Sequence, residues 1–223
     1  MGDFFRPEKQ TRVAFPIASA GYSFIYAAAF ATAVFALLEM KGVALLGLIA
    51  TFFICYFFRD PDRLVPVENK AVVSPADGKV IFAGPAEDTH FYEGTCIKIS
   101  IFMSVFNVHV NRIPHEGKIR RIEYHPGKFF SANLDKASAQ NEHNVVHIET
   151  ENGIHVCMVQ IAGLIARRIL CAVQAGDSVV RGQRFGMICF GSRVDVYLPA
   201  ETRIVVGMGE KIQAGSTVLG YLS

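Results

Sequence analysis

Two stretches near the C-terminus repeat one pattern: "GDSVVRGQRFGMI" runs from Gly176 to Ile188, and "GEKIQAGSTVLGYL" runs from Gly209 to Leu222. Each begins with a glycine and an acidic residue, continues through a β-branched residue and a second glycine, and closes on an apolar run. They differ by one inserted residue. Glycine and acidic residues are typical of turns, and β-branched residues favour strands. The pattern therefore predicts two similar hairpins.

Upstream of these hairpins, short apolar runs such as "KVIFAG", "TCIKISIFM" and "HVCMVQIAG" alternate with Gly, Pro and Asp. This spacing is typical of a mostly β domain of sandwich or barrel type. The paired hairpins resemble those of biotinyl/lipoyl-type barrel-sandwich domains. In this interpretation "GSRVDVYLPAETRIVV" connects two quasi-equivalent halves, and Ser192 lies where they meet.

The N-terminal part is far more apolar. No charged residue occurs in the 26 positions from Val13 to Leu38, and 17 more uncharged positions run from Gly42 to Phe58. A helix that crosses a membrane needs about 20 apolar residues. Because a short Glu39–Gly42 connection separates the segments, we expect a hydrophobic α-helical hairpin that either spans the membrane or re-enters it. A cleaved signal peptide is disfavoured, since its apolar region is shorter and no second one follows.

Charges on both sides of this hairpin predict its orientation. Basic residues precede and follow it, whereas its tip carries one acid and one lysine, so both ends are expected in the cytoplasm. The exit "FFRDPDRLVPVENK" is charged and contains proline, which predicts a membrane-associated hairpin at 1–63 and a separate domain at 64–223. The basic residues are Arg6, Lys9, Arg12, Arg59 and Arg63.

Composition excludes two classes of function. A net charge of +2 gives no clustered basic footprint for nucleic acid. Five cysteines without CxxC or similar spacing indicate free, mostly buried thiols and no metal site.

Two Gly-Ser pairs carry a more specific chemistry, Gly191–Ser192 and Gly215–Ser216. A serine hydroxyl that attacks the preceding carbonyl converts the peptide bond to an ester. β-Elimination then breaks the chain, and hydrolysis leaves a pyruvoyl group at the new N-terminus. Such a carbonyl forms a Schiff base with an amine and accepts electrons. By itself, a Gly-Ser pair indicates a turn.

Several motifs in a fixed order favour self-cleavage over a simple turn at Gly191–Ser192. Together they resemble the phosphatidylserine decarboxylase family, in its short form with an N-terminal membrane hairpin, over nearly the whole chain. The motifs are "FFRDP" (57–61), "SPADGKV" (74–80), "FNVHVNRIP" (106–114), "HPGKFFSANLDKASAQNEHN" (125–144), "ARRI" (166–169) and "FGSRV" (190–194).

The resemblance implies decarboxylation of phosphatidylserine to phosphatidylethanolamine and CO₂, in phospholipid biosynthesis. It implies that Ser192 becomes a pyruvoyl cofactor, and that self-cleavage leaves a β chain (1–191) and an α chain (192–223) as a heterodimer. The expected location is the cytoplasmic face of the cell membrane, where the partner is the lipid itself. A homo-oligomer is left open.

Longer family members are cut at Leu-Gly-Ser-Thr, so "AGST" at 214–217 is a competing site. Cleavage at Ser216 would release only eight residues, whereas cleavage at Ser192 releases 32. Short family members use Gly-Ser-Arg, and we therefore favour Ser192.

Three further residues follow from the resemblance. Asp77 is a candidate to activate a base in self-cleavage, although Asp-Gly is also a common turn. His109 matches the histidine implicated in decarboxylation, and Arg112 stands where longer members have a second histidine. Either His109 serves both steps or another group is the base, because Arg112 stays protonated and is better suited to hold a carboxylate or phosphate.

Other charged residues allow two interpretations. Lys136, Arg167 and Arg168 are either solvated or contact the substrate phosphate. His143, His147 and His155 have no spacing that favours a metal over ordinary placement.

Two rival functions account for part of the sequence. A membrane-anchored barrel-sandwich carrier would also have the hairpin and the repeat, but it needs a modifiable lysine at a hairpin tip and gives "FGSRV" no role. An enzyme acting on an ether lipid such as archaetidylserine stays open, because the chemistry touches only the headgroup.

Overall fold

The computed structural model describes residues 4–5, 16–87, 90–130, 140–164, 168–189 and 191–223. Its contacts divide the chain into two units, one of Thr11–Asp62 and one of Met1–Gln10 with Arg63–Ser223. The functional division at residues 63 and 64 stays a prediction.

The smaller unit is helical. A 3₁₀ turn at Ser19–Gly21 leads into α1 (Tyr22–Leu37), and α2 (Lys41–Phe57) follows. Ser19–Leu37 is long and apolar enough to cross a membrane, with a mean hydropathy of 1.6, whereas α2 has 17 residues. α1 buries none of its side chains and is apolar all round, which is the pattern of a helix in an apolar environment. The predicted pair of apolar helices is therefore present.

The larger unit is built from strands and confirms the predicted mostly β class. The strands are β1 (Phe4–Phe5), β2 (Val65–Pro66), β3 (Ala71–Val73), β4 (Gly78–Ala86), β5 (Cys96–Met103), β6 (Val110–Arg112), β7 (Gly117–His125), β8 (His143–Glu149), β9 (His155–Ala162), β10 (Ile169–Cys171), β11 (Ser178–Val179), β12 (Arg184–Ile188), β13 (Ser192–Pro199), β14 (Arg203–Ile204), β15 (Lys211–Ile212) and β16 (Val218–Tyr221).

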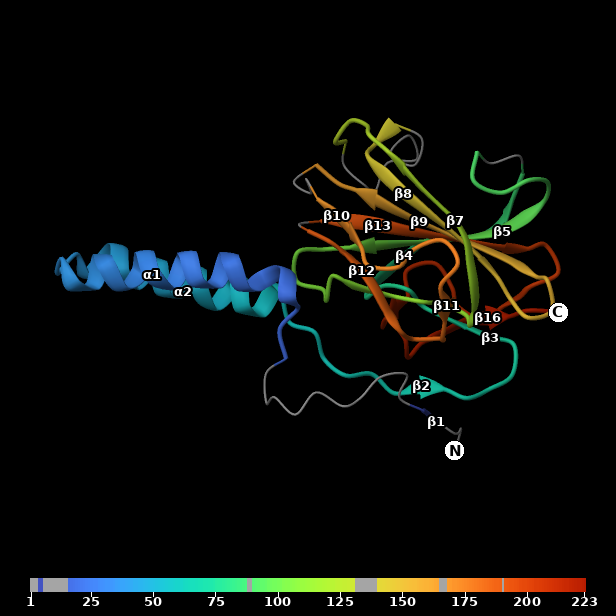
Figure 1. Ribbon diagram of the computed structural model, residues 1–223, viewed down its shortest axis with the longest axis horizontal. Coiled ribbons are helices and arrows are strands. Elements are labelled where there is room, and N and C mark those ends of the chain that lie inside the picture. The colour runs from blue at the N-terminus through green and yellow to red at the C-terminus, as the bar shows by residue number, and fades with distance from the viewer. Residues whose placement is uncertain (1–3, 6–15, 88–89, 131–139, 165–167, 190) are drawn as a thin grey trace. The chain divides into compact units, whose positions relative to one another are not determined.

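A curled eight-stranded sheet, in the order β11-β7-β8-β9-β13-β5-β4-β15, forms the body of this unit (Figure 1). Two three-stranded sheets, β10-β12-β6 and β14-β16-β3, complete it. The main core lies inside the curl, where alternate residues of β13 (Val194, Val196 and Leu198) are fully buried. The residues between them face the other side of the sheet, where Tyr197 joins a second apolar cluster.

The strand pairing is symmetric about the contact between β9 and β13. Outward from β9 come β8, β7 and β11, just as β5, β4 and β15 come outward from β13. Likewise, β12 pairs with β6 as β16 pairs with β3. We call β6–β9, β11 and β12 the inner half, because the chain inserts them between the strands of the outer half, β3–β5, β13, β15 and β16.

Register makes this equivalence exact to the residue. The β4–β5 pairing shifts between Val80 and Phe82, and the β7–β8 pairing shifts at the equivalent place, between Ile119 and Arg121. The quoted C-terminal stretches also match, because Gly176 and Gly182 have positive φ angles, as have Gly209 and Gly215. Neither stretch is the predicted hairpin: β11 pairs with β7 and β12 with β6, as β15 pairs with β4 and β16 with β3. The segment after Gly191 was expected to be a connection between the two halves. It is mainly β13, a central strand that pairs with β5 on one side and with β9 on the other.

Candidate active site

Ser192 is the first residue of β13 and lies inside the curled sheet. It pairs with Met103 on β5 and with Ala162 on β9, and its side chain is fully buried. Gly191 before it has a φ of 69°, in the left-handed region that glycine adopts without a steric penalty. The bond between these two residues therefore joins a glycine turn to a buried strand.

The Ser192 hydroxyl donates a hydrogen bond to the Met103 sulfur over 3.3 Å. A thioether is a weak acceptor and a flexible neighbour. The contact therefore places the hydroxyl without taking its proton.

Arg193 anchors the strand immediately after Ser192. Its Nε and Nη2 atoms lie 2.5 and 2.8 Å from the two oxygens of Asp195, and Nη2 also donates to Ser100 over 3.0 Å. Both charged side chains are buried. Removing one partner of such a pair costs about 3–5 kcal/mol, because the other charge stays in the interior. The pair therefore holds residue 192 in place from the opposite face of the sheet.

His109 lies just before β6 and is fully buried. Its Nδ1 atom is 2.9 Å from the carbonyl oxygen of Asn107. Because a carbonyl only accepts hydrogen bonds, Nδ1 carries the proton, and the lone pair of the neutral ring is on Nε2. The backbone oxygen of His109 accepts from Ile188, three residues before Gly191. This tautomer suits a base, and the backbone contact ties His109 to the segment that leads to Ser192.

Asp77 precedes β4, at the same end of β5 as Ser192. Phe102 pairs with Lys79 on one side and with Arg193 on the other, which brings the starts of β4 and β13 to that end. The Asp77 carboxylate accepts from the Ala214 amide over 2.7 Å and from Arg63 over 2.8 Å. These bonds join Asp77 to the turn that contains the second Gly-Ser pair.

The predicted substrate-binding residues lie in different places. Arg112 is buried, and its Nη1 donates to the carbonyl of Gly182 over 2.9 Å. Arg168 is exposed, and its carbonyl accepts from the amide of Cys189, beside the segment before Ser192. Lys136 and Arg167 lie outside the described residues. Contact of these four residues with substrate stays a prediction.

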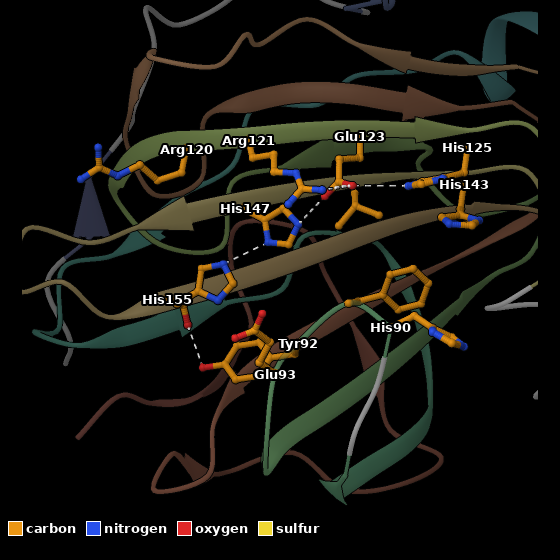
Figure 2. A pocket seen from close by; sticks show the side chains of 12 residues that line it. His90, Tyr92, Glu93, Arg120, Arg121, Glu123, His125, His143, His147 and His155 are labelled. Carbon is orange, nitrogen blue, oxygen red and sulfur yellow. Dashed lines mark hydrogen bonds and ion pairs between the residues drawn. The ribbon is translucent and has the colours of Figure 1, made fainter.

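A pocket of about 850 Å³ lies on the outer face of the sheet. His143 pairs with Ile161, whose other partner is Arg193, so the pocket and Ser192 are on opposite faces. Figure 2 shows His147 between Glu123 and His155. The Nε2 atom of His147 is 3.2 Å from Oε1 of Glu123, and its Nδ1 atom is 3.0 Å from Nε2 of His155. The lining residues are His90, Phe91, Tyr92, Glu93, Arg120, Arg121, Glu123, His125, His143, Val145, His147 and His155.

Burial lowers the pKa of His143, His147 and His155 below the usual value. Burial raises the pKa of Glu123, but the hydrogen bond and charge of Arg121 outweigh it and leave that pKa lowered. At neutral pH these imidazoles are therefore uncharged beside an ionised carboxylate. Among the described residues, no group of three or more His, Cys, Asp or Glu side chains is arranged to hold a metal ion.

Sequence reasoning missed this pocket, because the pocket depends on the pairing register of β7, β8 and β9. His125 pairs with His143 across β7 and β8, and the two rings stack with centroids 4.8 Å apart. His147 and His155 come from neighbouring strands and stack at 5.1 Å. The alternation of His143 and His147 with apolar residues was the available signal, but it names no partner strand.

Comparison with known proteins identifies relatives over almost the full length. A family model described as phosphatidylserine decarboxylase matches residues 50–220. The phosphatidylserine decarboxylase proenzyme of Syntrophus aciditrophicus is 54% identical over 208 residues, which is 92% of this chain and 96% of the relative. The proenzymes of Geotalea uraniireducens and Desulfotalea psychrophila are 50% and 48% identical over 207 residues, 93% of this chain and 97% of each relative.

Proposed function

The chain belongs to the phosphatidylserine decarboxylase family, and from this premise we propose that it is a proenzyme that cuts itself between Gly191 and Ser192 and then decarboxylates phosphatidylserine. The products are phosphatidylethanolamine and CO₂, which makes the enzyme a carboxy-lyase of phospholipid biosynthesis. The observation that carries the proposal is the buried Ser192 at the start of β13, directly after a left-handed glycine.

Self-cleavage begins with the Ser192 hydroxyl. Its oxygen bonds to the carbonyl carbon of Gly191, the bond from that carbon to the Ser192 nitrogen breaks, and the hydroxyl proton ends on this nitrogen. His109 is our candidate to carry that proton, because its Nε2 holds the ring lone pair. Loss of the Cα proton then expels the Gly191 carboxylate, and hydrolysis of the remaining enamine releases ammonia.

The position fits the pyruvoyl group that this reaction would leave at residue 192. Ser192 is buried, which keeps bulk water away from a reactive carbonyl, and Arg193 is fixed by Asp195 and Ser100. When present, the group supplies a carbonyl that condenses with the substrate amine and takes up the electrons of the broken carbon–carbon bond. We assign to His109 the return of a proton to the substrate carbon.

The two chains are proposed to stay together as a heterodimer. β13, which belongs to the α chain, pairs along its length with β5 and β9 of the β chain. The apolar helices support a membrane location close to a lipid substrate, and the flanking basic residues support the cytoplasmic face. Arg168, exposed beside the cleavage segment, is a candidate to meet the lipid phosphate.

Intact mass spectrometry of the purified protein tests the proposal. We expect a fragment that ends at Gly191 and a second that begins at residue 192, with a mass smaller by one ammonia than that of a serine N-terminus. Borohydride reduction in the presence of phosphatidylserine should give the small chain the mass of the reduced adduct, in which the Schiff base has lost one water and gained two hydrogens. An active preparation that contains only the full-length chain would exclude pyruvoyl chemistry, and labelling of the large chain alone would point to a lysine.

His109→Ala separates the two steps. A chain that is cut but turns over slowly assigns His109 to decarboxylation, and a chain that stays whole assigns it to self-cleavage as well. Normal cutting together with normal turnover would remove His109 from the mechanism.

A further inference from the structure

The two halves of the sheet differ at three equivalent interior positions. In the outer half these positions hold Val72, Ile97 and Leu198, all buried in the main core. Register assigns their counterparts in the inner half: Val72 and Asn111 both pair with a glycine, Gly220 and Gly186. Ile97 and Leu198 pair with each other, as do Asn144 and Gln160. The counterparts are Asn111, Asn144 and Gln160, and they are equally buried.

Folding does not require amides at these positions. The outer half builds the same strands and the same pairings with aliphatic side chains, and burying an amide is unfavourable unless its hydrogen bonds are made. Three amides in a core whose equivalent places are aliphatic therefore point to a chemical role.

The three amides form one oriented chain of hydrogen bonds. Asn144 donates to the Gln160 oxygen over 3.0 Å, and the Gln160 nitrogen donates to the Asn111 oxygen over 2.9 Å. The Gln160 nitrogen also lies 3.4 Å from the carbonyl of Leu170. Because the Asn111 oxygen is the acceptor, its NH₂ group must point the other way, toward the Met103 sulfur at 3.9 Å.

This NH₂ group and the Ser192 hydroxyl point to the same sulfur atom. The Ser192 hydroxyl donates to the same Met103 sulfur, so a weak acceptor separates the two groups. Gln160 faces the same interior as Ser192, one alternation along β9 from Ala162, the residue that pairs with Ser192. The amide chain therefore delivers an N–H donor to the residue that we propose is cut.

We propose that Asn111, oriented by Gln160 and Asn144, is the hydrogen-bond donor that stabilises the Gly191 carbonyl oxygen while Ser192 attacks. This inference rests on the proposed self-cleavage at Ser192. As the Ser192 oxygen bonds to the carbonyl carbon, the carbonyl oxygen becomes negative, and it loses that charge when the bond to nitrogen breaks. A fixed amide donor in a dry site stabilises this oxygen more than the neutral carbonyl. The flexible Met103 side chain yields its place to the oxygen.

Replacing all three amides by their counterparts removes the donors and the acceptors of the chain together. The triple variant N111V/N144I/Q160L gives the inner half the side chains that the outer half already packs. We expect it to fold with an unchanged or higher midpoint of thermal unfolding. Its first-order rate of chain cleavage, followed on denaturing gels after synthesis in a cell-free system, should fall by about 100-fold or more, the effect of removing one such donor.

Asn111→Asp isolates the donor. The aspartate keeps an oxygen for Gln160 but has no NH₂ group, so we expect the same slow cleavage. Hydroxylamine cuts an ester, and it should release little small chain from this variant, because the ester does not form. Release of the small chain would overturn the assignment, since it would show that the attack proceeds without the amide.

Asn141→Asp is the matched control. Asn141 is equally buried, but its nitrogen donates over 2.7 Å to the carbonyls of Phe130 and Ala162, so its role is to hold backbone. We expect a lower unfolding midpoint and a normal cleavage rate for the part that folds. Cleavage of the triple variant at the wild-type rate would refute the role of Asn111 but leave the proposed function intact. A wild-type chain that is never cut at residue 192 would refute the proposed function itself.

Discussion

The two Gly-Ser pairs of this chain share a left-handed glycine but not an environment. Gly191 and Gly215 have similar positive φ angles, 69° and 74°. Ser192 is fully buried at the start of an eight-residue strand, and its hydroxyl meets a sulfur. Ser216 lies in a turn and donates to the carbonyl of Leu64 over 2.9 Å. The dipeptide and the left-handed glycine are common to both, so a difference in reactivity must come from the conformation of the serine and from what surrounds its hydroxyl.

The symmetry of the sheet adds a third position to this comparison. Arg193 pairs with Phe102 as His155 pairs with Glu149, so Gly153 and Ile154 are equivalent to Gly191 and Ser192. Gly153 has a φ of 76°, and the hydroxyl is missing. The molecule thus contains the same turn with a hydroxyl, the same turn without one, and a Gly-Ser pair in another setting.

Replacing each of the two serines by alanine should give the largest difference in self-cleavage. We expect Ser192→Ala to stay whole and inactive, because no hydroxyl remains to attack the Gly191 carbonyl. Ser216→Ala should be cut and should turn over normally. Gel analysis and release of labelled CO₂ measure both variants, and an uncut Ser216→Ala chain would transfer the cleavage site to the second pair.

A carboxylate in each half gives the next comparison. Asp77 and Glu116 occupy equivalent places before β4 and β7, and each pairs with an arginine, Arg63 and Arg181. If Asp77 assists the base, Asp77→Asn should slow self-cleavage by about 100-fold, whereas Glu116→Gln should be cut at the normal rate. Equal rates for the two variants would make Asp77 a turn residue.

Stability should depend on pH through the inner half. His147 and His155 stand where the outer half has Ser100 and Arg193, so imidazoles replace an ion-paired arginine. Burial lowers the pKa of both histidines, so below about pH 6.5 the unfolded chain takes up protons that the folded chain does not. Stability is therefore full above this pH and falls as the solution becomes more acidic.

Thermal unfolding between pH 7.5 and 5 measures this loss. We expect a fall of a few degrees, since about 1 kcal/mol moves the midpoint of a chain of this size by roughly 2–4 °C. His147→Gln should flatten the dependence, although Glu123, His125 and Arg121 still face the position. A midpoint that rises toward pH 5 would contradict the lowered pKa values.

The smallest effect is expected where a new Gly-Ser pair is made. Ile154→Ser places a hydroxyl in the equivalent turn, but the amide chain that ends at Asn111 serves the other turn. We expect this chain to be cut at residue 192 alone, with a stability loss of about 1 kcal/mol from the lost side chain. A fragment that begins at residue 154 would show that the turn by itself suffices for cleavage.

Much of the fold followed from local patterns. Uncharged runs at 13–38 and 42–58 predicted two apolar helices, because helix formation in an apolar setting depends on the composition of one segment. The glycine spacing of the two C-terminal stretches predicted equivalent turns, because turn conformation is also local. The predicted hairpins were wrong, because the two strands of each stretch pair with strands elsewhere in the chain. The motifs around Ser192, His109 and Asp77 pointed to a family that the comparisons bear out, while the roles of these residues stay proposals.

Other features required the pairing of distant strands. The sequence by itself determined two apolar helices, a β domain with a repeated glycine-containing stretch, and a serine after glycine in a family motif. Tertiary structure decided that β13 is central, that Asn111, Gln160 and Asn144 join into one chain, and that histidines gather on the face opposite Ser192. The reason is physical: alternation fixes which residues of one strand share a face, but only register and strand order decide which residues of other strands they meet.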